Sequence, residues 1–371
     1  MSVQVSYSKQ FTLGIIILII LLASLEGFSR IYEVFNPDCT FLEKDAFEKI
    51  DYFTIRTICQ DLNTISYETF SGIIVVSSNQ HKDTLNINSH GFRGSDISKE
   101  KPDNTYRIFT VGGSTMFGVG STSDDTTIAG YLQKKIDNVD LGINIEVINA
   151  GLPKAESYTE SLYIKNKLIE FEPDLFIVYD GWNDLDHGII ESSNVEDNEI
   201  IQEENNQFKF KNFPFYRTPF VVWNIFYETP NHWDNFLIDE SKTEKKISLW
   251  VERWTDICKL GKIKNYETIL TIQPTLGTGN KILSSDETKL APYLDEHFGI
   301  IKGLERMEST LYQLDKNCVK TESLINIFDG ISAPIFYDIG HTNDFGNEII
   351  AQKLFELSLP VINDRTSKIE N

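Results

Sequence analysis

Apolar runs alternate with amphipathic stretches along this chain from about residue 100 onward. Runs of the kind that fill buried strands occupy 106–111, 143–150, 174–179, 267–272 and 324–328. Helical spacing of apolar residues follows them, over 126–136, 158–171, 244–261, 298–315 and 344–357. Apolar strands separated by helices predict a parallel sheet that is covered on both faces. We therefore expect an α/β fold, with ligands binding at the carboxyl ends of the strands.

The amino-terminal segment has a different pattern, because residues 11–25 are almost wholly apolar. This run is shorter than the roughly 20 residues that span a bilayer, but Phe28 and Ile31 extend it. We predict a single transmembrane helix that anchors the chain over residues 1–31. The alternative is a cleaved signal peptide, although a small-x-small cleavage pattern is missing. Lys9 precedes the run and a mostly acidic body follows it, which favours a large domain outside the cytoplasm.

Two regions interrupt the alternation and define the expected organisation. Residues 32–100 form a mixed prelude, and residues 184–242 form an insertion within a main domain over 101–360, which is followed by a tail over 361–371. The insertion is rich in aromatic residues, which we expect to pack together rather than to line a groove. These residues are Phe213, Phe215, Tyr216, Phe220, Trp223, Phe226, Tyr227 and Trp233.

Composition narrows the classes of function. With 371 residues and 41% hydrophobic content, the chain can bury a full core. A net charge of -21 and the lack of a basic cluster argue against a nucleic-acid partner. The six histidines show no spacing typical of a zinc site, so we expect no metal and no cofactor.

The chain contains four cysteines, Cys39, Cys59, Cys258 and Cys318. Three pairings are possible from the sequence alone. Cys39 and Cys59 are the closest pair and would staple the segment after the anchor if the domain is external. Four buried free thiols are the alternative.

Ser114 and the motif Asp338-x-x-His341 carry the candidate chemistry. Ser114 follows an apolar run that ends in Gly112-Gly113. A serine hydroxyl is a weak nucleophile at neutral pH and needs a general base, and a histidine base needs a carboxylate to orient its ring. This combination predicts a nucleophile, Ser114, with His341 as its base and Asp338 as the orienting group.

Other motifs give little support to a different enzyme class. Asp180 and Asp184 flank Gly-Trp-Asn, but at a strand end we expect them to accept hydrogen bonds from the loop backbone rather than to act as a glycosidase pair. The stretch 277–281 lacks the spacing of a phosphate-binding loop. A Gly-x-Ser-x-Gly elbow is missing, which counts against a typical α/β-hydrolase.

Four blocks in order make the chain resemble the SGNH hydrolases, also called GDSL-type esterases and lipases. They are Gly-Gly-Ser114-Thr, Asn-Ala-Gly151, Gly-Trp-Asn183-Asp and Asp338-x-x-His341. The resemblance covers about residues 105–357, and 88–93 looks like a lead-in segment of membrane-anchored or secreted members. Many relatives have Asp where this chain has Gly113, which puts the substrate class in more doubt than the activity.

The resemblance implies a three-layer α/β/α sandwich with a parallel, flavodoxin-like five-stranded sheet. It also implies an oxyanion hole made by the backbone N–H groups of Ser114 and Gly151 and the side-chain amide of Asn183. The expected function is a membrane-anchored, extracytoplasmic serine esterase that removes an O-acyl group, such as acetyl, from a glycan or a lipid. An O-acyltransferase with the same residues and a non-catalytic binding module are the alternatives.

Overall fold

The computed structural model describes residues 6–35, 39, 41, 44–186, 218, 240–290, 292, 294 and 297–369. The chain divides into two compact units, Met1–Asp38 with Glu196–Trp233, and Cys39–Val195 with Asp234–Asn371. Each unit is described by itself. Most of the insertion expected over 184–242, including all eight of its aromatic residues named above, lies outside the described residues.

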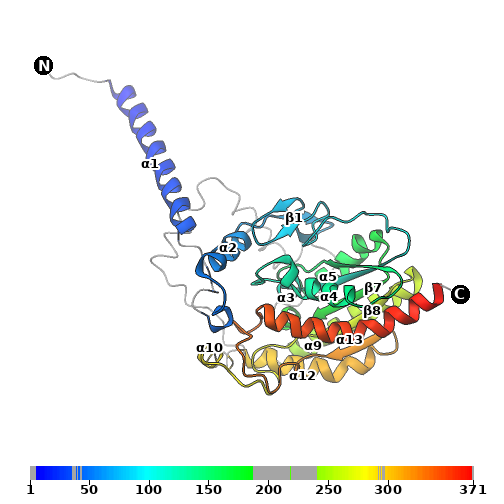
Figure 1. Ribbon diagram of the computed structural model, residues 1–371. Helices are drawn as coiled ribbons and strands as arrows, with labels where there is room; N and C mark the ends of the chain where they lie inside the picture. The colour runs from blue at the N-terminus through cyan, green and yellow to red at the C-terminus, as the bar shows by residue number, and fades with distance from the viewer. Residues whose placement is uncertain are drawn as a thin grey trace. The chain divides into compact units, whose positions relative to one another are not determined.

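The first unit contains α1 (Tyr7–Phe35), the long helix at the amino terminus (Figure 1). Its stretch Tyr7–Tyr32 has a mean hydropathy of 2.4, and only 6% of the most apolar window is buried. The helix is long and apolar enough to cross a membrane, and a signal sequence would have the same properties. Near its end, Glu26 accepts hydrogen bonds from Arg30 at 3.0 Å and from the Thr218 hydroxyl at 3.0 Å.

The second unit is built on a five-stranded parallel sheet with the order β6-β5-β7-β8-β9. Within this sheet, β5 comes first along the chain and therefore lies between the second strand, β6, and the third, β7. This order is flavodoxin-like, as expected, and the chain reverses direction across the sheet beside β5. The strands are β5 (Thr105–Gly112), β6 (Asn144–Asn149), β7 (Leu175–Asp180), β8 (Glu267–Ile272) and β9 (Lys320–Ser323).

The last strand is the one that the apolar pattern located wrongly. We expected it over 324–328, whereas β9 spans Lys320–Ser323 and pairs with β8. β9 is an edge strand of polar, partly exposed residues, so it has no apolar run. Leu324 and Phe328 are buried because the chain that leaves the strand packs into the core.

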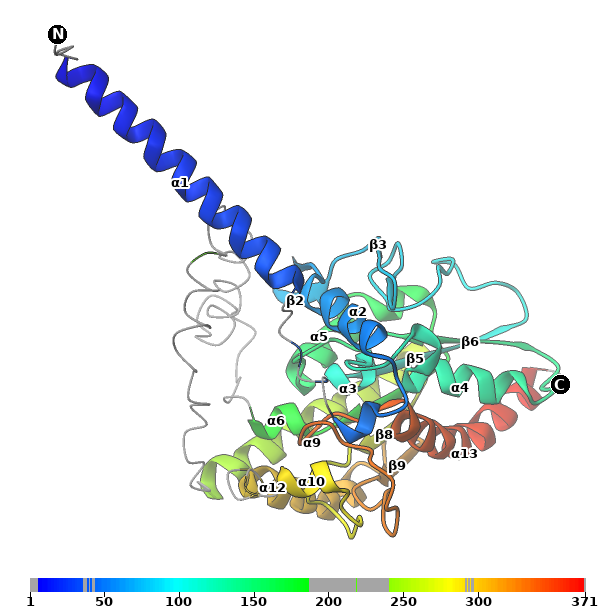
Figure 2. The same cartoon turned by 60° about the vertical axis from the view of Figure 1, so that its left-hand side comes forward.

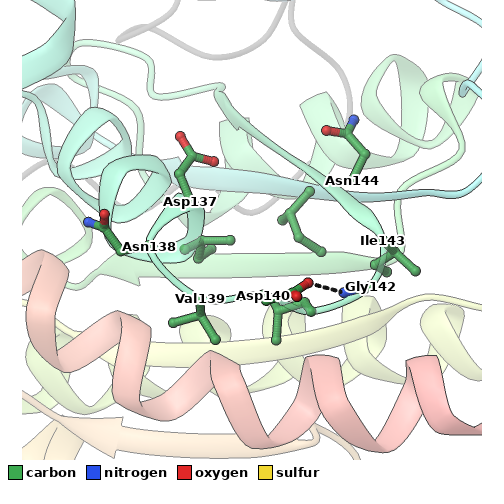
Figure 3. A pocket seen from close by; sticks show the side chains of 10 residues that line it. Asp137, Asn138, Val139, Asp140, Gly142, Ile143 and Asn144 are labelled. Atoms are coloured by element: carbon green, nitrogen blue, oxygen red, sulfur yellow. Dashed lines mark hydrogen bonds between the residues drawn. The ribbon is translucent and has the colours of Figure 1, made fainter.

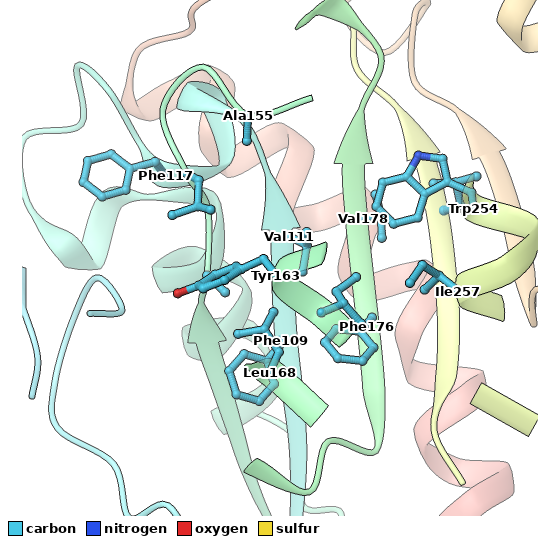
Figure 4. Packing of buried hydrophobic residues seen from close by; sticks show 14 of the residues in the cluster. Phe109, Val111, Phe117, Ala155, Tyr163, Leu168, Phe176, Val178, Trp254 and Ile257 are labelled. Atoms are coloured by element: carbon cyan, nitrogen blue, oxygen red, sulfur yellow. The ribbon is translucent and has the colours of Figure 1, made fainter. Parts of the chain in front are cut away.

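Side chains alternate between the two faces of the sheet along each strand, so each face has its own core. Helices cover both faces. Phe109, Val111, Phe176 and Val178 face a core that Trp254 and Ile257 of a covering helix complete (Figure 4). The helices of this face are α5 (Ser157–Asn166), α9 (Glu240–Lys264) and α12 (Phe298–Thr310).

The opposite face is covered by α4 (Ile128–Asp137) and α13 (Asp344–Ile369), which pack side by side (Figure 2). Ile108 and Ile177, each one position away from a residue of the first core, point into this second core. The α13 helix contains Pro360 and continues well beyond 357, where the periodic pattern ends.

Residues ahead of the sheet form one helix and two antiparallel hairpins. Asp51 caps the helix, because its Oδ1 accepts the N–H groups of Phe53 and Thr54 at 3.0 and 3.1 Å. The elements are α2 (Tyr52–Asn63), β1 (Tyr67–Phe70), β2 (Ile73–Val76), β3 (Gln80–His81) and β4 (Asn86–Ile87).

The segment from Cys39 to Asn63, called the stem below, is closed by an internal disulfide and packs on the domain. The disulfide joins Cys39 to Cys59. Phe41 and Phe47 pack against Tyr337, and the side-chain amide of Asn343 donates to the Ala46 carbonyl at 2.8 Å. The second disulfide, Cys258–Cys318, ties α9 to the chain just before β9, so all four cysteines are paired.

Candidate active site

Ser114 lies where β5 meets a short helix, α3 (Ser114–Phe117), for which Gly113 is the N-cap. The turn leaves no room for side chains before the serine. A Cβ at Gly112 would lie 2.4 Å from the Tyr179 carbonyl oxygen, and one at Gly113 would lie 2.5 Å from Asn183 Nδ2. A side chain at Gly112 would thus meet the backbone of β7, and one at Gly113 would require the Asn183 amide to shift.

His341 and Asp338 meet Ser114 from the loop before α13. The Nε2 atom of His341 lies 2.7 Å from Ser114 Oγ, and its Nδ1 atom lies 2.8 Å from Asp338 Oδ2. Asp338 Oδ1 also accepts the backbone N–H groups of Gly340 at 2.9 Å and of His341 at 2.7 Å. The carboxylate thus fixes the ring so that its far nitrogen points at the hydroxyl.

The electrostatics of the pair favour an ionised Asp338 and a basic His341. Burial alone would raise the pKa of Asp338, but the neighbouring imidazole and the three N–H donors lower it below its ordinary value. Burial would lower the pKa of His341, but the charge and the hydrogen bond of Asp338 outweigh this and raise the pKa. The ring is therefore a stronger base than a free imidazole.

A tyrosine that the sequence did not single out supports the ring. Tyr337 stacks on His341 with centroids 5.7 Å apart and planes 11° apart. Its hydroxyl donates to the Val119 carbonyl at 2.9 Å, and Phe41 and Phe47 of the stem contact its ring. Its place immediately before Asp338 is the only signal in the sequence.

Gly151 follows β6 and packs directly against the serine helix. A Cβ there would lie 2.2 Å from the Phe117 backbone nitrogen, so only glycine fits. The N–H of Gly151 donates to the Asn149 side chain at 3.0 Å. The Gly151 N–H, which we expected to be an oxyanion donor, is thus already hydrogen-bonded to Asn149, a residue for which the sequence predicted no role.

Asn183 lies in α6 (Trp182–Asp186), just after β7. Its Nδ2 donates to the Ala155 carbonyl at 2.6 Å, which uses one of the two amide hydrogens and leaves the other for a ligand. Because a Cβ on Gly113 would touch this nitrogen, the amide lies against the turn that carries Ser114. The carboxyl ends of β5, β6 and β7 therefore bring Ser114, Gly151 and Asn183 to one edge of the sheet.

The carboxylates near Asn183 are structural. Asp180 is buried and accepts hydrogen bonds from the indoles of Trp250 at 2.9 Å and Trp254 at 3.1 Å. Asp184 is buried and accepts the backbone N–H of Ser157 at 2.9 Å, as well as its hydroxyl. The expected backbone hydrogen bonds are found at both residues, from Gly181 to Asp180 and from Ser157 to Asp184, and the indole partners of Asp180 were not foreseen.

In the part of the chain that the structure describes, neither a metal-binding cluster nor the surface hollow at residues 136–145 belongs to this edge of the sheet. Among the described residues, no group of three or more His, Cys, Asp or Glu side chains is placed to hold a metal ion. A surface hollow of about 680 Å³ is lined by residues 136–145, between α4 and β6, where Asp140 accepts the N–H of Gly142 at 3.2 Å (Figure 3). It lies at the amino end of β6, whereas the candidate residues lie at the carboxyl ends of the strands.

Comparison with known proteins adds only distant similarities. No protein-family model and no curated protein matches the chain. The acetyl xylan esterase AlAXEase is 15% identical at a TM-score of 0.41, with 68% of this chain and 98% of that chain covered. A mutant of Axe2, an acetyl-xylooligosaccharide esterase from Geobacillus Stearmophilus, is 13% identical at 0.42, with 68% and 93% covered. TesA is 12% identical at 0.40, with 68% and 98% covered.

Similarities this low carry no conclusion about activity. The four sequence blocks that resemble those of SGNH hydrolases lie at one edge of a flavodoxin-like sheet.

Proposed function

We propose that this chain is a serine esterase of the SGNH type, with Ser114 as nucleophile, His341 as general base and Asp338 as the group that orients the base. The observation that carries the proposal is the 2.7 Å contact between His341 Nε2 and Ser114 Oγ, because a base must lie within hydrogen-bond reach of the proton that it removes. Asp338 binds the other ring nitrogen of His341, as the group that orients a base beside its nucleophile must do.

The reaction proceeds in two halves. The Ser114 hydroxyl gives its proton to His341 as Oγ bonds to the carbonyl carbon of the ester, and the imidazolium then protonates the leaving alcohol as the C–O bond breaks. Water repeats these steps on the acyl-enzyme, so that the carboxylic acid is released and Ser114 is regenerated. Asp338 stabilises the imidazolium in both halves.

Negative charge that develops on the carbonyl oxygen needs donors that are already in place. We assign this role to the backbone N–H of Ser114, the free amide hydrogen of Asn183 and the N–H of Gly151. The Gly151 N–H must then be shared with, or released by, the Asn149 side chain, which now accepts it. Loss of one such donor typically costs about 3–4 kcal/mol in the barrier.

The substrate that we propose is an O-acyl ester of a glycan or a lipid, such as an O-acetyl group, outside the cytoplasm. Two disulfides support this location, because disulfides persist in oxidising compartments. The apolar helix α1 is consistent with attachment to a membrane. A domain held at a membrane surface on its oxidising side would meet acylated surface glycans and lipids.

The test uses the full chain in detergent, with an aryl acetate as substrate and a fluorophosphonate as covalent probe. Ser114→Ala and His341→Ala should each abolish turnover with little change in the melting temperature, and the probe should label Ser114 in the parent protein. Ser309→Ala, on the exposed side of α12, serves as the control and should keep full activity.

Failure of the folded parent protein to label would refute the esterase and favour a binding module. Turnover that requires an acceptor glycan would reassign the same residues to acyl transfer.

A further inference from the structure

The lead-in segment at 88–93 ends in an arginine that the proposed chemistry does not use. Arg93 is only 5% exposed, and its Nε donates to Asp124 at 2.8 Å. Its Nη1 donates to the carbonyl oxygens of Phe117 at 3.1 Å and Gly118 at 2.7 Å. These carbonyls end the short helix that begins at Ser114, so the guanidinium binds the far end of the nucleophile's own turn.

Helix ends leave carbonyl groups without partners inside the helix. Here Gly118 terminates α3 in a left-handed conformation with φ of 91°, and Arg93 supplies the missing donors. The guanidinium also lies over the Phe117 ring, 5.3 Å from its centroid. Its Nη2 also donates to the Thr84 carbonyl at 3.5 Å, so the guanidinium serves three carbonyls and one carboxylate. This arrangement suits the planar fork of arginine and does not suit the single ammonium group of lysine.

The same residue also binds the neighbouring turn. The backbone N–H of Arg93 donates to the Asn149 carbonyl at 3.1 Å, in an antiparallel bridge at the carboxyl end of β6. The side chain of Asn149 then donates to the Phe117 carbonyl at 3.3 Å and accepts the Gly151 N–H at 3.0 Å. Arg93 and Asn149 thus converge on one carbonyl and link the turn of Ser114 to the turn of Gly151.

We propose that Arg93 is a positioning residue, which holds the Ser114 turn and the Gly151 turn at the separation that the oxyanion hole requires. This inference rests on the proposed esterase function. Arg93 acts through the backbone of both turns and touches neither the substrate nor the reacting atoms. Its loss would therefore slow the chemical step more than it weakens substrate binding.

The chain contains a matched control in Arg107. This side chain is fully buried, its Nε donates to Glu146 at 2.8 Å, and its Nη1 donates to the carbonyl oxygens of Lys99 at 3.1 Å and Phe171 at 2.8 Å. Like Arg93, it is a buried guanidinium that binds one carboxylate and backbone carbonyls, but it lies near the start of β5, whereas Ser114 follows the end of that strand.

The experiment compares Arg93→Lys with Arg107→Lys in the full chain. We measure kcat and KM for an aryl acetate, the rate of fluorophosphonate labelling at Ser114, and the melting temperature. Both variants should melt at lower temperature. Arg93→Lys should lower kcat and the labelling rate by about 10- to 100-fold with KM within about threefold of the parent value, because small misplacements of reacting groups cost up to about 10²-fold. Arg107→Lys should keep kcat within about twofold.

Equal loss of kcat in the two variants, or an unchanged kcat and labelling rate in folded Arg93→Lys, would overturn the inference. If Arg93→Lys does not fold, Asp124→Asn provides a milder change. It removes the charge that holds the guanidinium and one of the two oxygens that accept the N–H groups of Arg93 and Asn86. A several-fold drop in kcat at constant KM is expected for Asp124→Asn, and parental kinetics would overturn the proposal. A parent protein that neither turns over ester nor labels would instead reject the esterase function itself.

Discussion

Replacement of Gly151 by alanine tests the close approach between the second turn and the serine helix. The added Cβ would lie 2.2 Å from the Phe117 nitrogen, 2.6 Å from its Cα and 2.7 Å from the Met116 carbonyl carbon. All three atoms belong to the backbone, so no side chain can rotate away. Ordinary contact begins at 3.4 Å, so the turn and α3 must separate by about 1.2 Å (3.4 less 2.2).

Gly151→Ala keeps its backbone N–H, so any loss of activity reports a change of position. A displacement of about 1 Å commonly costs about 10²-fold in rate, and overpacking costs about 1–3 kcal/mol of stability. We therefore expect kcat for an aryl acetate to fall about 100-fold, with a lower melting temperature by calorimetry.

Gly340→Ala is the control for this experiment. It is adjacent to His341, but its Cβ would lie an unstrained 3.9 Å from Trp182, so activity should persist. A Gly151→Ala enzyme with parental kcat and melting temperature, or an equally damaged Gly340→Ala enzyme, would refute the reasoning.

Three further outcomes are expected. Burial lowers the pKa of His341, but Asp338 raises it more strongly, so the pKa lies above its ordinary 6.5. In a pH–rate profile, kcat/KM should therefore fall as pH drops through the raised pKa, and Asp338→Asn should move this acid limb to lower pH. Replacement of Cys258 and Cys318 by serine opens a 60-residue loop and should cost about 4 kcal/mol in denaturant unfolding, with esterase activity retained by the folded fraction. Burial and nearby carboxylates raise the pKa of Glu160 well above 4.5, so folding loses stability as pH rises above 4.5, and Glu160→Gln should raise the melting temperature at pH 7 but not at pH 4.

The sheet could be predicted because its central strands are buried on both faces. The expected strand 267–272 coincides with β8, and 174–179 lies within one residue of β7. The position of edge strand β9 was not predicted, because its residues are polar. The apolar run that we assigned to it belongs to the chain after it. The apolar pattern indicates which residues are buried, and it locates a strand only where the strand itself is buried.

The contact between Ser114 and His341 could be predicted, because each residue lies in a recognisable sequence motif. Residues that support the site through contacts between distant segments could not be predicted. Arg93 reaches Phe117, and Tyr337 meets the stem, only through the tertiary fold. The arginine between two glycines in Gly91-Phe92-Arg93-Gly94 was a visible signal, but nothing in the sequence indicated which carbonyls it serves.

The stem would also determine which cleavage releases an intact domain if α1 anchors the chain in a membrane, as we propose. Tyr337 has the imidazole of His341 on one side and Phe41 and Phe47 on another, so the stem forms part of the wall behind the base. Proteolytic shedding ahead of Cys39 would free the domain with this wall intact. Cleavage after Asn63 would instead leave the stem, closed by its internal Cys39–Cys59 disulfide, attached through non-covalent contacts, and its departure would remove the packing behind the tyrosine. The position of the cut would then decide whether the released domain keeps this packing.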